Sequence, residues 1–328
     1  MLTTRIAAAT GVAAVVLAMT AASAMACPTR GCQDLPPPDG SEAGSGDGTV
    51  YVQVWGSGTT NGSSGGFEVP LREIAIMPPC RYIPGMTGQE YYDWFRNGGA
   101  IGHADGDPYE PHPGYEQHQD DTEGVWWGGM CSSADFDGTL GEFFDYSSGW
   151  FDENDSIYVQ PGDPQPVPPI PPEVLVNYAY DSMDIPDPQL AWNPRRGADA
   201  ATFVNLATWV WLEDSPVTLE VNAAAGGNTA TVVAELSGMT VSAPTAEPAV
   251  CGGAGVPWSA TATTDCAIVF TRSSANQPDQ ATEVTVETTW TVDWFANGAP
   301  QGPLQPQTMT ETTDIPVAEV QALVTGNP

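Results

Sequence analysis

The stretch TEVTVETTWTVDW, residues 282–294, decides the fold class of this chain. Apolar and polar side chains alternate along its thirteen residues. A period of two over this length is typical of a long β-strand with one buried face. The apolar side chains of the predicted inner face are Val284, Val286, Trp290, Val292 and Trp294.

Further strand-like runs lie on both sides of this stretch, and turn signals at residues 226–228 and 297–298 separate some of them as hairpins require. The predicted strands are Val50–Trp55, Phe67–Met77, Phe203–Leu212, Val217–Ala223, Thr229–Leu236, Ala267–Arg272 and Gln307–Thr313. Many short strands after about residue 201 predict an Ig-like β-sandwich. The expected fold is mainly β, with this C-terminal sandwich and a small disulfide-closed N-terminal domain that has one or two short helices.

Helix signals and Pro-rich segments divide the chain. Thr87 and Glu90 fit a capping box, with Gly98 as a stop signal, and Pro172 opens a second helix that extends to about Met183. The expected units follow in chain order. They are a flexible Gly/Ser/Pro linker at 27–49, an acidic Cys80/Cys131 domain at 50–160, a Pro-rich linker at 161–172, and a helix plus sandwich at 173–328.

The N-terminus predicts export. Arg5 precedes the apolar run Ile6–Ala18, and small residues end at Ala24-Met25-Ala26, so residues 1–26 match a cleavable signal peptide. The run from Ile6 to Ala26 is also long enough for an uncleaved membrane anchor. Cys27, directly after the cleavage site, leaves lipidation as a third alternative. Each alternative predicts a secreted protein or one on the extracellular side of the cell envelope.

Six cysteines agree with an oxidising compartment. Their spacing favours three sequential disulfides: Cys27–Cys32, Cys80–Cys131 and Cys251–Cys266.

The charge balance excludes several classes of partner. The chain has 41 Asp and Glu against 8 basic residues, all of them Arg, which gives a net charge of −33. Binding to nucleic acid or to an anionic membrane surface needs clustered Lys and Arg, so we expect neither partner. Fourteen of the acids lie between Asp105 and Asp155. This segment is predicted to attract cations and repel anions.

A further set of short motifs is spread along the chain: Pro78-Pro79-Cys80, Gly124–Gly128, the helix at Glu173 with Ile185-Pro186, Asn205–Leu212, Cys266 with Phe270–Pro278, and Glu319–Ala322. Together these motifs resemble a group of secreted actinobacterial proteins of unknown function. In that group a Cys-containing N-terminal domain is joined through Pro to a sandwich related to polycystic-kidney-disease (PKD-like) domains. The resemblance covers roughly residues 70–325 and implies fold and location more than function.

One departure from the group's pattern limits what the resemblance implies. Many relatives have a Gly-Asp-Gly turn before the first sandwich Cys and a His after the second. Here Ser237-Gly238-Met239 and Ala267-Ile268 stand in those places. A role that depends on that turn or that His is therefore not carried over.

All three histidines lie in one acidic segment. His103, His112 and His118, together with Asp105 and Asp107, have the side chains that bind Zn²⁺ or Cu²⁺. Gly and Pro interrupt the segment, so the alternative is a solvated acidic loop. The Asp-rich stretches 135–138, with Glu142 and Asp145 nearby, and 152–155 supply oxygen ligands of the kind that suit Ca²⁺. Neither stretch fits an EF-hand loop, and the alternative is a charged surface. A divalent metal is therefore a possible cofactor.

The Trp residues are candidates for binding or for packing. Trp126 and Trp127 stand next to glycines, which suits an exposed platform for a sugar or a protein partner, and the alternative is that both are core residues. Trp209 and Trp211 are expected in the sandwich core beside Trp290.

No motif for catalysis is strong. Gly62–Gly66 matches GxSxG without the strand and helix that a nucleophile elbow needs. We expect a non-catalytic interaction or structural module that binds cell-wall glycan or another surface protein. The alternatives are a metal-binding surface protein that uses the His-containing loop, and a secreted hydrolase with a carboxylate pair.

Overall fold

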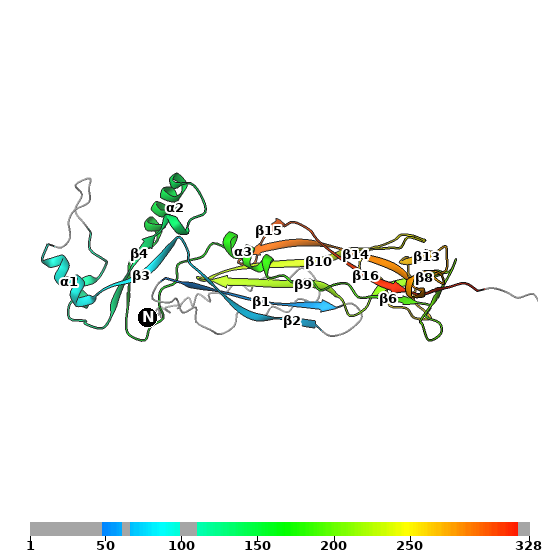
Figure 1. The fold of residues 1–328 in the computed structure, drawn as a ribbon. Coiled ribbons are helices and arrows are strands. Elements are labelled where there is room, and N and C mark those ends of the chain that lie inside the picture. Colours follow the sequence, from blue (N-terminus) through cyan, green and yellow to red (C-terminus); the bar gives the residue numbers. More distant parts are fainter. Residues whose placement is uncertain (1–47, 61–65, 99–109, 321–328) are drawn as a thin grey trace, which may run out of the picture.

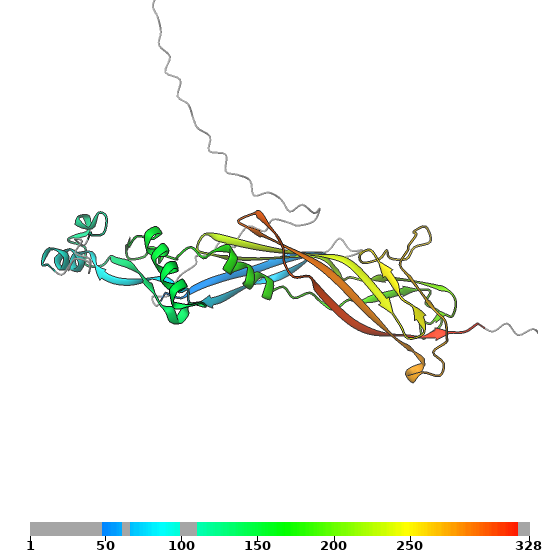
Figure 2. The ribbon, with the colours of Figure 1, turned by 90° about the horizontal axis from the view of Figure 1, so that it is seen from above.

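The computed structural model describes residues 48–60, 66–98 and 110–320. The expected signal segment, linker 27–49 up to residue 47, and the Cys27–Cys32 pair lie outside these residues. The fold is mainly β, as predicted, and elongated, with three α-helices in the part that is described (Figures 1 and 2).

One long antiparallel sheet forms the body of the protein. Its strand order is β15-β14-β10-β9-β1-β2, and β16 and β12 add to β14 and β10. The bounds are β1 Val50–Thr60, β2 Gly66–Ile76, β9 Pro216–Ala225, β10 Asn228–Ser242, β12 Ala249–Cys251, β14 Thr282–Ala296, β15 Ala299–Pro303 and β16 Gln307–Ile315. The strand predicted from residues 282–294 is β14, and its alternation is seen as buried and exposed positions in turn.

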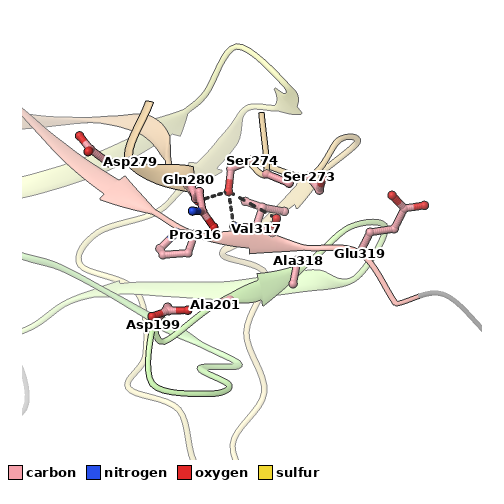
Figure 3. A pocket seen from close by; sticks show the side chains of 11 residues that line it. Asp199, Ala201, Ser273, Ser274, Asp279, Gln280, Pro316, Val317, Ala318 and Glu319 are labelled. Atoms are coloured by element: carbon pink, nitrogen blue, oxygen red, sulfur yellow. Dashed lines mark hydrogen bonds between the residues drawn. The ribbon is translucent and has the colours of Figure 1, made fainter. Parts of the chain in front are cut away.

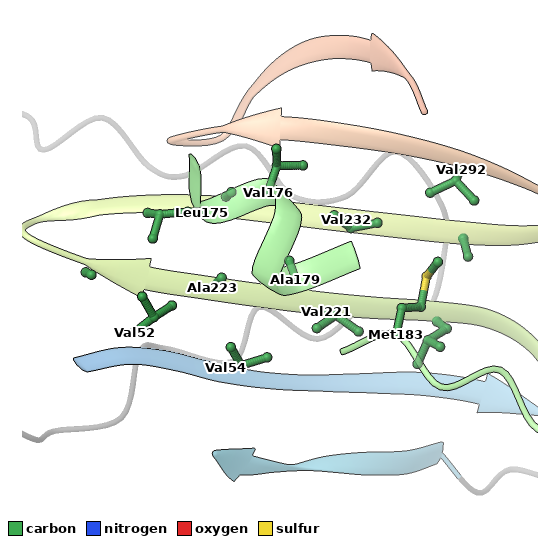
Figure 4. Packing of buried hydrophobic residues seen from close by; sticks show 14 of the residues in the cluster. Val52, Val54, Leu175, Val176, Ala179, Met183, Val221, Ala223, Val232 and Val292 are labelled. Atoms are coloured by element: carbon green, nitrogen blue, oxygen red, sulfur yellow. The ribbon is translucent and has the colours of Figure 1, made fainter. Parts of the chain in front are cut away.

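Two cores lie on the same face of this sheet. At one end, α3 (Pro172–Asp181) packs Leu175 and Ala179 against the strands (Figure 4). At the other end, a four-stranded sheet packs over β10 and β14 and makes a β-sandwich. Its order is β11-β13-β8-β6, with β6 Leu190–Asn193, β8 Ala207–Leu212, β11 Ala246–Glu247 and β13 Ala267–Phe270.

A β-bulge in β10 keeps both cores on one face. Leu236 pairs with Trp290 and Gly238 pairs with Thr289, so Ser237 is an extra residue. Because a single extra residue reverses the alternation, the inward positions of β10 change from even numbers before the bulge to odd numbers after it. Val232 and Val241 therefore face the same side of the sheet, each in one of the two cores.

A small module is inserted between the second strand of the sheet and α3. Its sheet has the order β3-β4-β5, with β3 Cys80–Thr87, β4 Val125–Cys131 and β5 Ile157–Val159. Its helices are α1 Gly88–Arg96 and α2 Leu140–Glu153, with 3-10 turns η1 Tyr115–His118 and η2 Ser133–Asp135. We call residues 80–98 and 110–159 the inserted module. It lies at one end of the long sheet, and α1 is at its tip (Figure 1). The remaining short elements are β7 Thr202–Phe203, η3 Pro278–Gln280 and β17 Val317–Ala318.

The expected unit 50–160 needs correction, because its first two strands belong to the long sheet. β1 pairs with β9 and with β2, and Val50, Val52 and Val54 pack in the α3 core. Alternation identified β1 as a half-buried strand but carried no information about its partner. The Pro-rich linker also contributes to this core, because Ile170 is buried there and its carbonyl accepts a hydrogen bond from Asn228 Nδ2 at 3.0 Å.

A second correction concerns β8. Thr208, Val210 and Leu212 point into the sandwich core, while Trp209 and Trp211 are on the half-buried outer face. Both sets alternate, so the period alone did not decide which set faces inward. The prediction that Trp209 and Trp211 lie in the sandwich core is therefore wrong.

Candidate interaction surface on the inserted module

The disulfide Cys80–Cys131 closes the inserted module where β3 and β4 begin their pairing. The Cys251–Cys266 disulfide lies in the sandwich, so both pairings predicted within the described residues are confirmed. Next to Cys80, Arg81 donates from Nη1 to Asp135 Oδ2 at 2.8 Å and to the carbonyl of Pro78. The Arg81 hydrogen bond holds the pKa of Asp135 below its usual value.

Trp126 and Trp127 pack on opposite faces of the module's sheet, because successive residues of a strand alternate. Trp127 lies with Tyr82 and Trp150 of α2, and Trp126 lies with Tyr91 of α1 and Tyr115. Trp126 is 4% exposed and Trp127 is 6% exposed. The core alternative therefore describes both residues, and neither presents an exposed ring to a ligand.

The two described histidines are part of the aromatic cluster around Trp126. His112 stacks on Tyr91 with ring centroids 4.3 Å apart, and His118 stacks on Tyr158 at 3.6 Å. His103, Asp105 and Asp107 lie outside the described residues, so the metal prediction stays untested as a set. Within residues 48–60, 66–98 and 110–320 no group of three His, Cys, Asp or Glu side chains is placed to hold a metal ion.

Acidification is expected to loosen this cluster. Burial lowers the pKa of His112 below its usual 6.5, against a smaller opposite effect of Asp155. As the pH falls, His112 is protonated at a higher pH in the unfolded chain than in the folded one. The contribution of neutral His112 to the free energy of unfolding is therefore present above pH 6.5 and declines as the pH falls below that value. Amides of α1 and β4 should lose hydrogen-exchange protection between about pH 7.5 and about pH 5, after correction for intrinsic rates. A His112→Phe variant should lose this dependence, and equal protection in the unmodified protein at both pH values would contradict the expectation.

Helix α2 was not predicted from the sequence, although a signal for it is present. Thr139 is its N-cap, and its hydroxyl accepts a hydrogen bond from the amide of Glu142, whose carboxylate accepts from the amide of Thr139. This Thr-x-x-Glu capping box is the same signal that located α1. From the sequence, the acids at 135–155 are expected to be calcium ligands or a charged surface. Two of them, Asp135 and Glu142, are instead engaged with Arg81 and with the helix terminus.

One side of α2 seats the helix on the module. Phe143 and Trp150 are buried, and Trp150 lies 5.3 Å from Tyr82 between ring centroids. Gly129 of β4 makes this seat possible, because a Cβ there would lie 2.2 Å from Trp150 Cζ3 and 2.7 Å from Cε1 of the half-exposed Phe151. The helix therefore lies close against the strand.

The other apolar side of α2 is exposed. Leu140 is 61% exposed, Phe144 59% and Phe151 49%. At 100° per residue these three positions fall within about 40° of one another around the helix axis. We call Leu140, Phe144 and Phe151 the α2 stripe. The apolar arc of α2 is thus wider than the module covers.

The surroundings of the α2 stripe are acidic. Residues 135–155 contain seven carboxylates, and the chain has no Lys or Arg from residue 97 to residue 194. Asp135 and Glu142 accept the hydrogen bonds from Arg81 and from the amide of Thr139. The other five carboxylates of this segment take no part in those two contacts. The five are Asp137, Asp145, Asp152, Glu153 and Asp155, and all are exposed.

A polar pocket lies in the sandwich, beside η3 and β17 (Figure 3). Its volume is about 610 Å³, and Asp199, Asp279 and Glu319 contribute its carboxylates. Ser274 is buried, and its hydroxyl donates to the carbonyl of Gln280 and accepts from the amide of Val317. That hydroxyl therefore ties three backbone segments together. Among the described residues the one buried carboxylate is Glu220, which accepts from Asn222 Nδ2 and does not line this pocket.

The comparisons with known proteins add no relative. No family model matches the chain, and neither the curated proteins nor the solved structures include a significant match. The resemblance to secreted actinobacterial proteins therefore stays a prediction. No helix in the described part of the chain is long and apolar enough to cross a membrane.

Proposed function

We propose that this chain is an exported, non-catalytic binding protein whose binding face is the α2 stripe. The observation that carries the proposal is the exposure of Leu140, Phe144 and Phe151 on one side of a helix whose other side is firmly seated. Three large apolar side chains grouped in this way are typical of a protein-binding surface, unlike apolar residues that are exposed singly.

Export is supported by two features. The N-terminus has the order of charged, apolar and small residues of a signal peptide, and two disulfides are formed in the folded chain. The location that we propose is the outside of the cell or the extracellular side of its envelope.

The arrangement of the fold suits a binding role. The long sheet carries the inserted module at one end, so α2 is held away from the sandwich (Figures 1 and 2). A surface protein and wall glycan are the two candidate ligands. We favour a surface protein, because the Trp rings that would stack on a sugar are buried in the module.

Retention on cell envelopes tests the proposal. The purified protein is mixed with envelopes of the cells that make it, before and after surface proteins are removed by protease. A Phe144→Ser/Phe151→Ser variant should lose about tenfold in retention, because both rings leave the contact. A Leu71→Ser/Val250→Ser variant, which changes two exposed apolar residues of the long sheet, should be retained like the unmodified protein.

The outcomes separate the ligands. Retention that disappears with protease treatment identifies a surface protein, and retention that survives it identifies wall glycan. Equal retention of the two variants would overturn the proposal that the α2 stripe is the binding face.

A further inference from the structure

The α2 stripe has the dimensions of one side of a helix–helix contact. From Leu140 to Phe151 the helix rises about 16 Å, which is three turns. Apolar positions four and seven residues apart present ridges that fit the apolar positions of a second helix. The contact needs a partner with one continuous apolar face of the same length.

The charges beside the stripe restrict the kind of partner helix that can bind. Asp145 and Asp152 lie seven residues apart on α2, and they project from one flank at about 120° and about 100° from the centre of the stripe. Asp137 precedes the helix and Asp155 follows it, whereas Glu153, the last residue of α2, points about 160° away from the stripe. Asp145 and Asp152 therefore put negative charge on this flank over about two turns, and residues 97–194 contain no Lys or Arg to neutralise it.

We infer that the α2 stripe binds a cationic amphipathic helix of another protein, with its apolar face on the stripe and its Lys or Arg side chains against Asp145 and Asp152. This inference rests on the proposed function and specifies its partner. A complementary charge on the partner increases the rate of association and selects among apolar helices.

A second copy of this chain is a poor occupant of the stripe. Its own net charge is −33 with 8 Arg and no Lys, so two copies repel each other, and α2 offers no base to the acids of another α2. The same acids repel an anionic membrane surface. The positive charge that the site requires must therefore come from a different molecule.

Peptide titration tests the inference with the whole purified protein. The probe is a fluorescently labelled helical peptide of about 18 residues with Leu on one face and Lys elsewhere. Two matched peptides serve as controls: one has the same composition in scrambled order, and one has Glu in place of each Lys. Fluorescence anisotropy is measured at about 0.05 M and about 0.5 M salt.

We expect the Leu/Lys peptide to bind about tenfold or more tightly than either control peptide, and more weakly at high salt. The Phe144→Ser/Phe151→Ser protein should lose about tenfold in affinity. An Asp145→Asn/Asp152→Asn protein, which keeps every apolar contact, should bind more weakly at low salt and show a smaller salt dependence. This second variant keeps the test valid if the Ser pair disturbs α2.

Four results would overturn the inference. The scrambled peptide binding as tightly as the Leu/Lys peptide would mean that charge alone attracts it. The Glu peptide binding as tightly would mean that charge has no role. Sedimentation of the protein as a dimer that the Ser pair dissociates would assign the stripe to a second copy. If the peptides fail while envelope retention still depends on Phe144 and Phe151, this inference falls and the proposed function stands.

Discussion

Replacing Cys80 and Cys131 together by Ser is expected to unfold the inserted module and leave the long sheet folded. The two cysteines are 51 residues apart, and closing a loop of that length stabilises the folded state by about 4 kcal/mol in the chain-entropy model. The module has a three-stranded sheet and two small aromatic clusters, which share no residue with the cores of the long sheet. A unit of this size buries little apolar surface, so its free energy of unfolding is small.

Limited proteolysis with mass analysis of the fragments measures this effect. New cleavage sites should appear between residues 80 and 159, while the strands from residue 172 onward stay protected. The matched control is Cys251→Ser/Cys266→Ser, which opens a loop of 15 residues worth about 3 kcal/mol and lies in the sandwich. Cleavage inside the inserted module of this control, with none in the sandwich, would contradict the division into two independent parts.

Trp290→Ala is expected to destabilise the long sheet and to leave the inserted module unchanged. Trp290 is 2% exposed in the α3 core, and its indole Nε1 donates to Thr288 Oγ1 at 3.2 Å. Truncating a buried Trp to Ala costs about 3–5 kcal/mol, because the transfer free energy is lost and a cavity remains. The free energy of unfolding of the long sheet should fall by this amount.

Urea unfolding of the sheet, followed through hydrogen exchange of β9 and β10, measures the change. Trp258→Ala is the matched control, because Trp258 is 49% exposed and its removal should cost about 0.5 kcal/mol or less. Protection of the module's own strands, β3 and β4, should be unchanged in both variants. Equal losses at Trp290 and Trp258 would show that the inward face of β14 is wrongly assigned.

Local chemistry made much of the fold predictable. Alternation located β14 and β9, the Thr87–Glu90 capping box located α1, and Pro172 located the start of α3. These signals act within one element, so a single sequence contains them. The pairing of β1 with β9 is a contact between residues about 170 apart, and no local signal records it.

The candidate site was less predictable for a related reason. Trp126 and Trp127 are equally apolar whether exposed or buried, and only the strand's two covered faces place both in the core. The α2 stripe requires two facts: that residues 140–153 are helical, and which side of that helix the module covers. The capping box of Thr139 and Glu142 is a sequence signal for the first fact, that a helix begins at residue 140. The second fact, which side of α2 is covered, depends on the packing of the Trp150 ring against Gly129 of β4.

Site-directed photo-crosslinking records which surface of the protein touches a partner on intact envelopes, so it is a direct test of binding through the α2 stripe. Benzoylphenylalanine is placed at Phe144 in one protein and at Leu71 of β2, which is also exposed, in another. We expect a discrete protein adduct from position 144, with Lys- or Arg-rich peptides at the attachment point, and none from position 71. Adducts from position 71 alone, or in equal yield from both positions, would contradict the assignment of the α2 stripe as the binding face.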